Sequence, residues 1–242
     1  MTASQLDAVV VGSGPNGLSA AVTLALAGRS VRVYEVAETI GGGARSAELT
    51  APGFVHDVCS AIHPFGAASP FFAKLPLEKY GLEWVHPGIP LAHPLDDGTA
   101  GTLDRSLKAT ARGLGDDGRS YYKLMRPYVG SFNKLADAFL GPIIRVPPHP
   151  LLMARFGMHA VRSAEGLTRR FEGEHARALF GGISAHATLP LDHPLTASFG
   201  LILASAGHAV GWPIARTGSQ AITDALAALL RASGGEIVTG HR

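Results

Sequence analysis

The amino-acid sequence predicts an α/β protein built on a parallel sheet, into which a largely helical segment is inserted. An apolar, β-branched run at Ala8–Val11 leads through a glycine-rich turn into a helical pattern. A second β-type run, Val31–Tyr34, follows that helix, as a β-α-β unit requires. Near the carboxyl end, a further helix and strand follow a long helical stretch, so we expect the last strand to rejoin the same sheet.

The first helix is predicted from its spacing and its ends. Pro15 suits a first helical turn, and Gly28 is suited to a left-handed stop. The apolar positions recur at helical intervals and define the buried stripe. They are Leu18, Ala21, Val22, Ala25 and Leu26.

The turn between the first strand and this helix reads Gly12-Ser13-Gly14-Pro15-Asn16-Gly17, a G-x-G-x-x-G pattern in the context that its mechanism needs. Gly12 can make a tight turn, Gly14 lets a pyrophosphate approach the backbone, and Gly17 lets the helix pack closely on the strand. Free N–H groups and the positive end of the helix dipole favour an anion there. We therefore predict a dinucleotide site, with Gly12, Ser13, Gly14, Pro15, Asn16 and Gly17 as contact residues.

Glu35 ends the second strand about 20 residues after the glycines, where an acid accepts hydrogen bonds from a ribose hydroxyl. An acidic residue favours a free ribose over a 2′-phosphate. The alternative is a solvated glutamate that closes an ordinary strand. The fingerprint alone does not distinguish NAD from FAD, because both present an ADP moiety to the same turn.

A second glycine cluster, Ile40-Gly41-Gly42-Gly43-Ala44-Arg45-Ser46, follows too closely to start another domain. With the first motif, it resembles the glutathione-reductase-type flavoprotein superfamily. The stretches Pro52–Phe54, His56–Ser60 and His63-Pro64 resemble the phytoene desaturase and carotenoid ketolase branch. Weaker similarity extends to Gly211–Pro213 and Gly218–Ala221. Gly43 and the Ile214–Thr217 segment depart from the pattern of that branch.

The resemblance implies an FAD cofactor whose diphosphate and ribityl chain contact Gly41, Gly42 and Arg45. It implies a desaturase or dehydrogenase that moves a hydride from an apolar, isoprenoid-like substrate to the flavin. Members of that branch are about twice as long, so the chain resembles their N-terminal half, with an incomplete sheet and a partial substrate domain. We expect an unpaired apolar sheet edge and a requirement for a complementary C-terminal chain. No catalytic residue is assigned.

The remaining elements follow in order. Leu91–Leu95 and Thr99–Leu103 predict a hairpin turning at Asp97-Gly98. Helical spacing starts near Asp116 and runs to a stop at Pro142, and two helices broken near Gly166 are expected within Leu151–Phe180. Leu195–Trp212 reads as a buried helix. A last helix, capped by Ser219 and ended by Gly234-Gly235, precedes the strand Glu236–Thr239.

These elements give a dinucleotide-binding segment at 1–90, a hairpin and helical partial substrate domain at 91–215, and a return to the first domain at 216–242. With 46% hydrophobic and 17% charged residues, the composition is that of a globular chain. A net charge of +2 without a dense basic run argues against a nucleic-acid partner. No stretch has the roughly 18 apolar residues of a membrane span, although peripheral membrane contact would suit an isoprenoid substrate.

One cysteine, Cys59, excludes an internal disulfide or a paired-cysteine redox site and fits a reducing, cytoplasmic compartment. His56, Cys59 and His63 lack the ligand set of a metal centre, so no metal is expected. The scattered histidines are interpreted as surface or core residues. Besides the FAD-dependent oxidoreductase, two hypotheses stay open: a non-catalytic nucleotide-binding subunit, and an NAD-dependent dehydrogenase.

Overall fold

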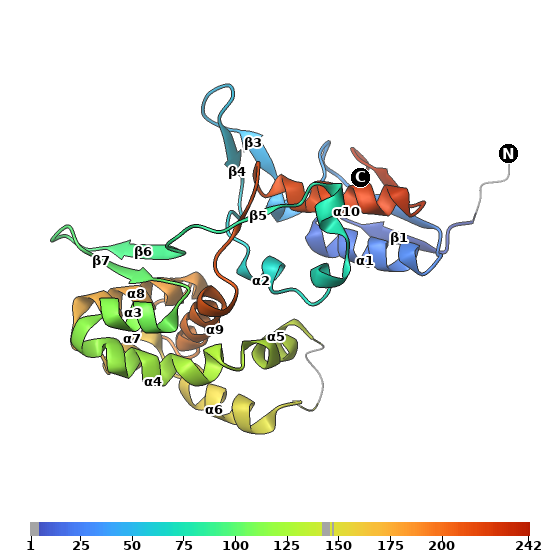
Figure 1. Ribbon diagram of the computed structural model, residues 1–242. Coiled ribbons are helices and arrows are strands. Elements are labelled where there is room, and N and C mark those ends of the chain that lie inside the picture. The colour runs from blue at the N-terminus through green and yellow to red at the C-terminus, as the bar shows by residue number, and fades with distance from the viewer. Residues whose placement is uncertain (1–4, 142–145, 147) are drawn as a thin grey trace. The chain divides into compact units, whose positions relative to one another are not determined.

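The computed structural model describes residues 5–141, 146 and 148–242. The chain folds into two compact units (Figure 1). The first comprises the residues up to His63 together with Phe71–Val85 and Ile214–Arg242, and the second comprises Pro64–Pro70 and His86–Pro213. This division differs from the expected boundaries at residues 90 and 215, because the strand Ile214–Ala215 pairs with a strand of the first unit.

The first unit is built on a parallel sheet of β1 (Ala8–Val11), β2 (Val31–Tyr34) and β9 (Glu236–Val238). β2 lies in the middle and is paired in parallel with both neighbours. The parallel sheet and its inserted helical segment are thus as predicted, with the last strand returning to β2. Because side chains alternate along a strand, Val10 and Val33 face one side, whereas Val9 and Val11 face the other and are exposed.

Two helices, α1 (Pro15–Leu26) and α10 (Gln220–Ala232), pack against each other and cover the Val33 face of the sheet (Figure 1). The predicted stripe of α1 is buried except for Leu26, the last residue of the helix, which is 55% exposed. Gly28 and Gly234 adopt the left-handed conformations that end the two helices. The buried apolar residues of α10 include the predicted Ile222, Ala225, Leu226, Leu229 and Leu230.

The rest of the first unit is made of short elements. β3 (Ser46–Glu48) and β4 (Val55–Asp57) form an antiparallel hairpin, and β5 (Trp84–Val85) pairs with β8 (Ile214–Ala215). The 3₁₀ turns are η1 (Gly42–Ala44), η2 (Phe72–Lys74) and η3 (Leu77–Tyr80). Arg216 donates two hydrogen bonds to the Glu83 carboxylate, which gives the atypical Ile214–Thr217 segment a structural role beside β5.

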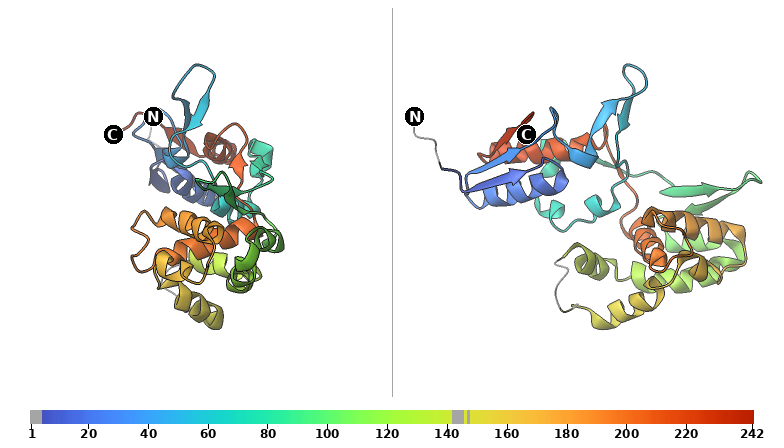
Figure 2. Two further views of the ribbon diagram at one scale, coloured as in Figure 1. Left: turned by 90° about the vertical axis from the view of Figure 1, so that its left-hand side faces the viewer. Right: turned by 180° about the vertical axis from the view of Figure 1, so that it is seen from behind.

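The second unit is helical apart from the predicted hairpin of β6 (Leu91–Pro94) and β7 (Ala100–Leu103), whose loop contains Gly98 at φ +82°. Its other elements are α2 (Pro64–Ala67), α3 (Leu107–Gly113), η4 (Gly115–Asp117), α4 (Gly118–Val129), α5 (Phe132–Leu140), α6 (Pro150–Ala160), α7 (Ala164–Thr168), α8 (Glu174–Ser184), η5 (Ala185–Ala187) and α9 (Thr196–Ala209). Helix α9 is buried among the others, as expected for Leu195–Trp212 (Figure 2). None of the described helices has the length and apolarity to cross a bilayer.

The helical spacing predicted from Asp116 onward corresponds to two helices, since the chain breaks at Gly130-Ser131 after a proline in the last turn of α4. One expectation for the helical block is wrong in detail. Gly166 lies inside α7 rather than at a break. The Ser163 hydroxyl accepts a hydrogen bond from the Gly166 N–H and starts that helix, so the breaks fall before Ser163 and after Thr168. Pro142 lies outside the described residues.

Candidate functional site

The glycine turn sits between β1 and α1, at the carboxyl end of the sheet. Gly12 has φ +94°, a conformation that favours glycine, and its N–H donates to the Tyr34 carbonyl oxygen at 2.7 Å. A Cβ atom at Gly17 would overlap the Gly12 carbonyl oxygen. The close packing of the helix on the turn therefore depends on the missing side chain of Gly17.

The second glycine segment packs directly against this turn. Gly41 donates from its N–H to the Ser13 carbonyl oxygen at 3.1 Å. A Cβ atom built on Gly42 would lie 3.0 Å from the Gly14 Cα, whereas one built on Gly14 would lie 3.8 Å from the Gly42 Cα. Gly14 thus has room for a small group on the side that faces Gly42. The structure brings the two predicted glycine segments together backbone to backbone.

Gly14 is also the N-cap residue of α1, so the first turn of that helix starts where the two glycine segments meet. No side-chain oxygen caps the turn, and it contains no acidic residue. The N–H groups of a first helical turn have no intrahelical acceptor and attract an anion. Arg45 lies at the end of the second glycine segment and donates from Nε to the Gly42 carbonyl oxygen at 3.0 Å. The predicted residues at the site therefore offer donors and a cation to a bound phosphate.

Glu35 is buried and hydrogen-bonded, not solvated. Its Oε2 accepts from the Ser13 hydroxyl at 2.6 Å and the Ser13 N–H at 2.8 Å, and Oε1 accepts from the Ala37 N–H at 3.0 Å. These bonds, the Ser13 hydroxyl first, lower the pKa of Glu35 from the ordinary 4.5 to about 2. The carboxylate is ionised at neutral pH and ties β2 to the glycine turn. A role for Ser13 as a partner of Glu35 was not anticipated from the sequence.

A cavity of about 400 Å³ lies beside Glu35 and Gly12. It is lined by Val11, Gly12, Tyr34, Glu35, Val36, His241 and Arg242. The His241 ring lies 4.6 Å from the Tyr34 ring, and the His241 N–H donates to the Glu35 carbonyl oxygen at 2.9 Å. His241 and Arg242 follow the third parallel strand, and the carboxyl ends of neighbouring parallel strands form the usual ligand crevice. This rule, applied to the sequence, could have predicted both residues as part of the site.

The N-terminus of α10 is held to the second glycine segment by a polar network. Asp57 Oδ1 accepts from the Ser46 hydroxyl at 2.6 Å and the Ser219 N–H at 2.7 Å, and Ser46 Oγ accepts from the Gln220 N–H at 3.0 Å. The Ser219 side chain does not cap α10 as predicted, because its hydroxyl donates to the Ser60 carbonyl oxygen. The network positions the walls of an 810 Å³ cavity that Arg45 and Gln220 line.

The histidines near this network have partners other than a metal. His63 Nε2 lies 2.7 Å from the Ser219 hydroxyl, and His56 Nε2 lies 2.8 Å from the Thr50 hydroxyl. Across the described ranges, no cluster of three or more His, Cys, Asp or Glu side chains could hold a metal ion. In the second unit His208 is a core residue, bonded to the Tyr121 hydroxyl at 2.9 Å, and burial lowers its pKa to about 4.

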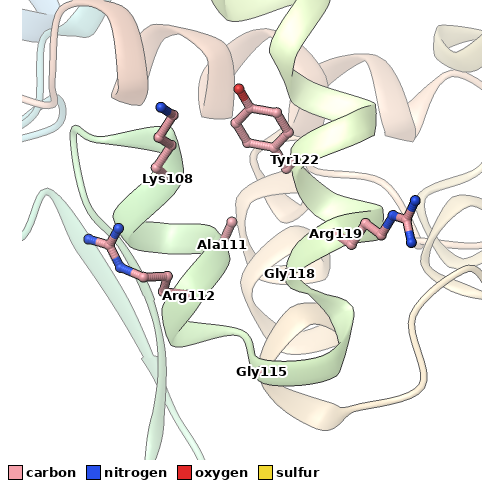
Figure 3. Close-up of a pocket in the computed structure, with 7 residues that line it drawn as sticks. All are labelled: Lys108, Ala111, Arg112, Gly115, Gly118, Arg119 and Tyr122. Atoms are coloured by element: carbon pink, nitrogen blue, oxygen red, sulfur yellow. The ribbon is translucent and has the colours of Figure 1, made fainter.

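The second unit carries a separate groove of about 470 Å³ between α3 and α4. Lys108, Arg112, Arg119 and Tyr122 line it, with small residues at its floor (Figure 3). Figure 3 shows the Arg112 and Arg119 side chains pointing to opposite sides. The cations of this groove do not converge on one point, so it does not form a defined anion site.

The ionised Glu35 makes stability depend on pH. Because its pKa is lower in the folded chain than in the unfolded one, its contribution is complete above about pH 4.5 and is lost as the pH falls through about 2. We expect this group to account for a loss of roughly 2 kcal/mol in unfolding free energy between neutral and strongly acidic pH. The Glu35→Gln variant should lack that pH-dependent part and lose about 1–3 kcal/mol at neutral pH.

Urea denaturation at a series of pH values measures both quantities. Glu236→Gln removes the same charge from the adjacent strand, where Glu236 is exposed and paired with Arg32, and should cost under about 1 kcal/mol. An identical pH dependence in wild type and Glu35→Gln would show that Glu35 is not the group responsible.

Comparisons with known proteins support the Rossmann-like fold. Residues 10–75 match the family described as NAD(P)-binding Rossmann-like domain. A limonene dehydrogenase subunit from Castellaniella defragrans is 28% identical over 142 residues, 57% of this chain and 25% of that protein. Pyridine nucleotide-disulfide oxidoreductase domain-containing protein 2 of Mus musculus is 36% identical over 105 residues, 43% of this chain and 18% of that protein.

Among solved structures, putrescine oxidase is similar with a TM-score of 0.58 at 20% identity, over 98% of this chain and 51% of its own. The chain thus spans about half the length of that structure, and the matched regions cover smaller parts of the two curated relatives. The fold is therefore a Rossmann-like nucleotide-binding domain on a parallel sheet, with a helical insertion. The resemblance to the phytoene desaturase branch in particular stays a prediction.

Proposed function

We propose that the chain binds FAD and serves an oxidoreductase of the dehydrogenase or desaturase type. The observation that carries this proposal is the close packing of Gly42 on Gly14, at an uncapped helix N-terminus and near the ionised Glu35. A single glycine turn would suit NAD equally well. A second glycine segment packed on the first favours a longer cofactor, because it extends the backbone surface beyond the pyrophosphate.

Each residue has a proposed binding role. The N–H groups at Gly14, Asn16 and Gly17 would receive the pyrophosphate, and Gly42 and Arg45 would contact the diphosphate and the ribityl chain. Glu35 Oε1 accepts the Ala37 N–H and keeps lone-pair capacity for a ribose hydroxyl. When bound, the flavin supplies the hydride acceptor. The chain's own residues bind and orient it, and none is assigned as a catalytic base.

The proposed substrate is an apolar molecule of isoprenoid type. Support comes from the sequence resemblance and from a curated relative that is named for limonene, a hydrocarbon. A cytoplasmic enzyme in peripheral contact with a membrane would suit such a substrate.

A second candidate is a nucleotide-binding subunit that becomes active only with a partner chain. Val9 and Val11 favour it, since they lie on an edge strand and are 55% and 87% exposed. Exposed apolar residues beside an open strand edge are a typical surface for association. The curated relative is itself named as a subunit.

We expect the purified chain, incubated with FAD and then desalted, to retain flavin absorbance, and the released compound to have the mass of FAD. NAD⁺ in the same experiment should be lost on desalting. Retained flavin without reduction by an apolar terpene, followed by reduction when a partner chain is added, would favour the subunit hypothesis. Binding of NAD⁺ without flavin would contradict the proposal and favour an NAD-dependent dehydrogenase.

A further inference from the structure

The second unit contains a buried cationic nitrogen that lacks a hydrogen-bond partner. Arg170 lies two residues after the end of α7, and its Nε is buried without an acceptor among the described residues. Burial lowers the pKa of this guanidinium, and the nearby Arg162 lowers it further. An unpaired charged donor inside a protein is costly, so such a group normally has an anionic partner.

The groups around Arg170 are also donors and cations. The Tyr128 hydroxyl donates to the Arg155 carbonyl oxygen at 3.1 Å and lies 2.6 Å from His159 Nδ1. Because a hydroxyl has a single hydrogen, His159 Nδ1–H donates to Tyr128 in turn. Burial and the charges of Arg170, Arg155 and Arg162 lower the pKa of His159. Tyr128 of α4, Arg155 and His159 of α6, and Arg162 and Arg170, which flank α7, thus lie near one another, and three of them are guanidinium cations.

No carboxylate is bonded to this cluster within the part of the chain that the structure describes. Of the three acids within five residues of Arg170, Glu165 is paired with the exposed Arg169 at 3.1 Å, and Glu172 and Glu174 are themselves exposed. The charged groups that shift the pKa of Arg170 are Arg162 and Tyr128, and neither is a carboxylate. The sequence between Gly141 and Pro148, which includes the undescribed residues, contains no Asp or Glu. Arg170 therefore has no counter-charge among the described residues.

We propose that Arg170, with Arg155, Arg162 and His159, forms a binding site for an oxyanion of the phosphoryl or carboxylate class. The two surface arginines, Arg155 and Arg162, are exposed and can attract the anion, and the buried Arg170 Nε can donate to it. Arg162 is held at the rim by its bond to the Gly166 carbonyl oxygen at 3.0 Å. Three guanidinium groups favour a phosphoryl group, which carries more charge than a carboxylate.

This site differs from the groove between α3 and α4, where the arginine side chains diverge and the described residues leave no donor buried without a partner. Its residues belong to the second unit, whereas the proposed nucleotide site is built from residues of the first, and none of them is assigned a role in cofactor binding. Its failure in an experiment would therefore leave the proposed function untouched.

The test is the binding of inorganic phosphate by the full chain. Calorimetry and thermal unfolding, both at constant ionic strength, measure that binding. Arg170→Met keeps most of the side-chain volume and should weaken phosphate binding about tenfold or more, because a charge-assisted bond is lost. The variant without phosphate should unfold at an equal or higher temperature than wild type, since a desolvated charge is removed. Arg162→Met tests the rim of the site and should weaken binding without touching the buried group.

Arg169→Met is the matched control, because it removes one positive charge from the adjacent, exposed position. It should leave phosphate binding unchanged. Acetate in place of phosphate distinguishes the two anion classes. If phosphate raises the unfolding temperature of the chain more than acetate does, the ligand is a phosphoryl group, and if the two anions raise it equally, the ligand is a carboxylate. If wild type responds to phosphate no more than to chloride, or if Arg170→Met binds phosphate as wild type does, the site does not exist.

Discussion

Gly14→Val is expected to abolish FAD binding while the chain stays folded. Gly14 has φ −69° and ψ 173°, an extended conformation that any residue adopts, so the substitution does not strain the backbone. Its Cβ would lie at an ordinary contact distance of 3.8 Å from the Gly42 Cα. The valine methyl groups would then occupy space at the start of α1, where the proposed pyrophosphate approaches the backbone. The loss should be at least about a hundredfold in affinity, with Gly14→Ala intermediate.

Fluorescence or calorimetric titration with FAD and with ADP measures this loss, and circular dichroism reports the fold. Gly113→Val is a suitable control, because Gly113 ends α3 in the second unit and has open space around its Cβ position. It should bind FAD as wild type does. Normal FAD affinity in a folded Gly14→Val variant would place the cofactor elsewhere and would contradict the proposed site.

The nucleotide-binding part of the fold could be predicted because its signals are local. The β-branched runs, the glycine turn and the helical stripe of α1 all lie within a continuous stretch of sequence, and the structure has each of them. The late return of β9 was predictable from Ile222–Leu230 and Glu236–Val238, because a helix followed by a strand repeats the earlier unit. These elements also fix the place of Gly14 and Glu35 at one edge of the sheet.

Other features depend on contacts between distant residues, which the sequence pattern does not contain. The position of Glu35 was predictable, but its bonds to Ser13 arise from how the glycine turn folds over β2. Likewise, the Ser219 hydroxyl is of a type that caps helices, yet it donates to the Ser60 carbonyl oxygen. Arginine is mostly an exposed residue type, and the sequence pattern did not single out Arg170. The burial of its Nε follows from the packing of helices that are distant in the chain.

The Gly17→Ala substitution should lower the stability of the nucleotide-binding unit. It tests a structural role of Gly17 that is distinct from the binding role of Gly14. The added Cβ atom would overlap the Gly12 carbonyl oxygen, a backbone atom held in place by the bond from the Gly12 N–H to the Tyr34 carbonyl oxygen. The added Cβ atom cannot move away without displacing α1, and the Gly12 carbonyl oxygen cannot move away without displacing β2. We expect a loss of roughly 3 kcal/mol in the stability of this unit.

Hydrogen exchange of peptides from β1, α1 and β2 measures that loss locally, and a change of about 3 kcal/mol corresponds to a roughly hundredfold faster exchange. Gly157→Ala makes the same chemical change inside α6, where nothing lies near the added Cβ. It should stabilise its helix by about 0.5–1 kcal/mol, so the two variants have opposite signs. Unchanged exchange in Gly17→Ala would mean that the helix does not rest on the glycine turn as closely as the structure has it. The proposed pyrophosphate site depends on that packing, because it sets where the first N–H groups of α1 point.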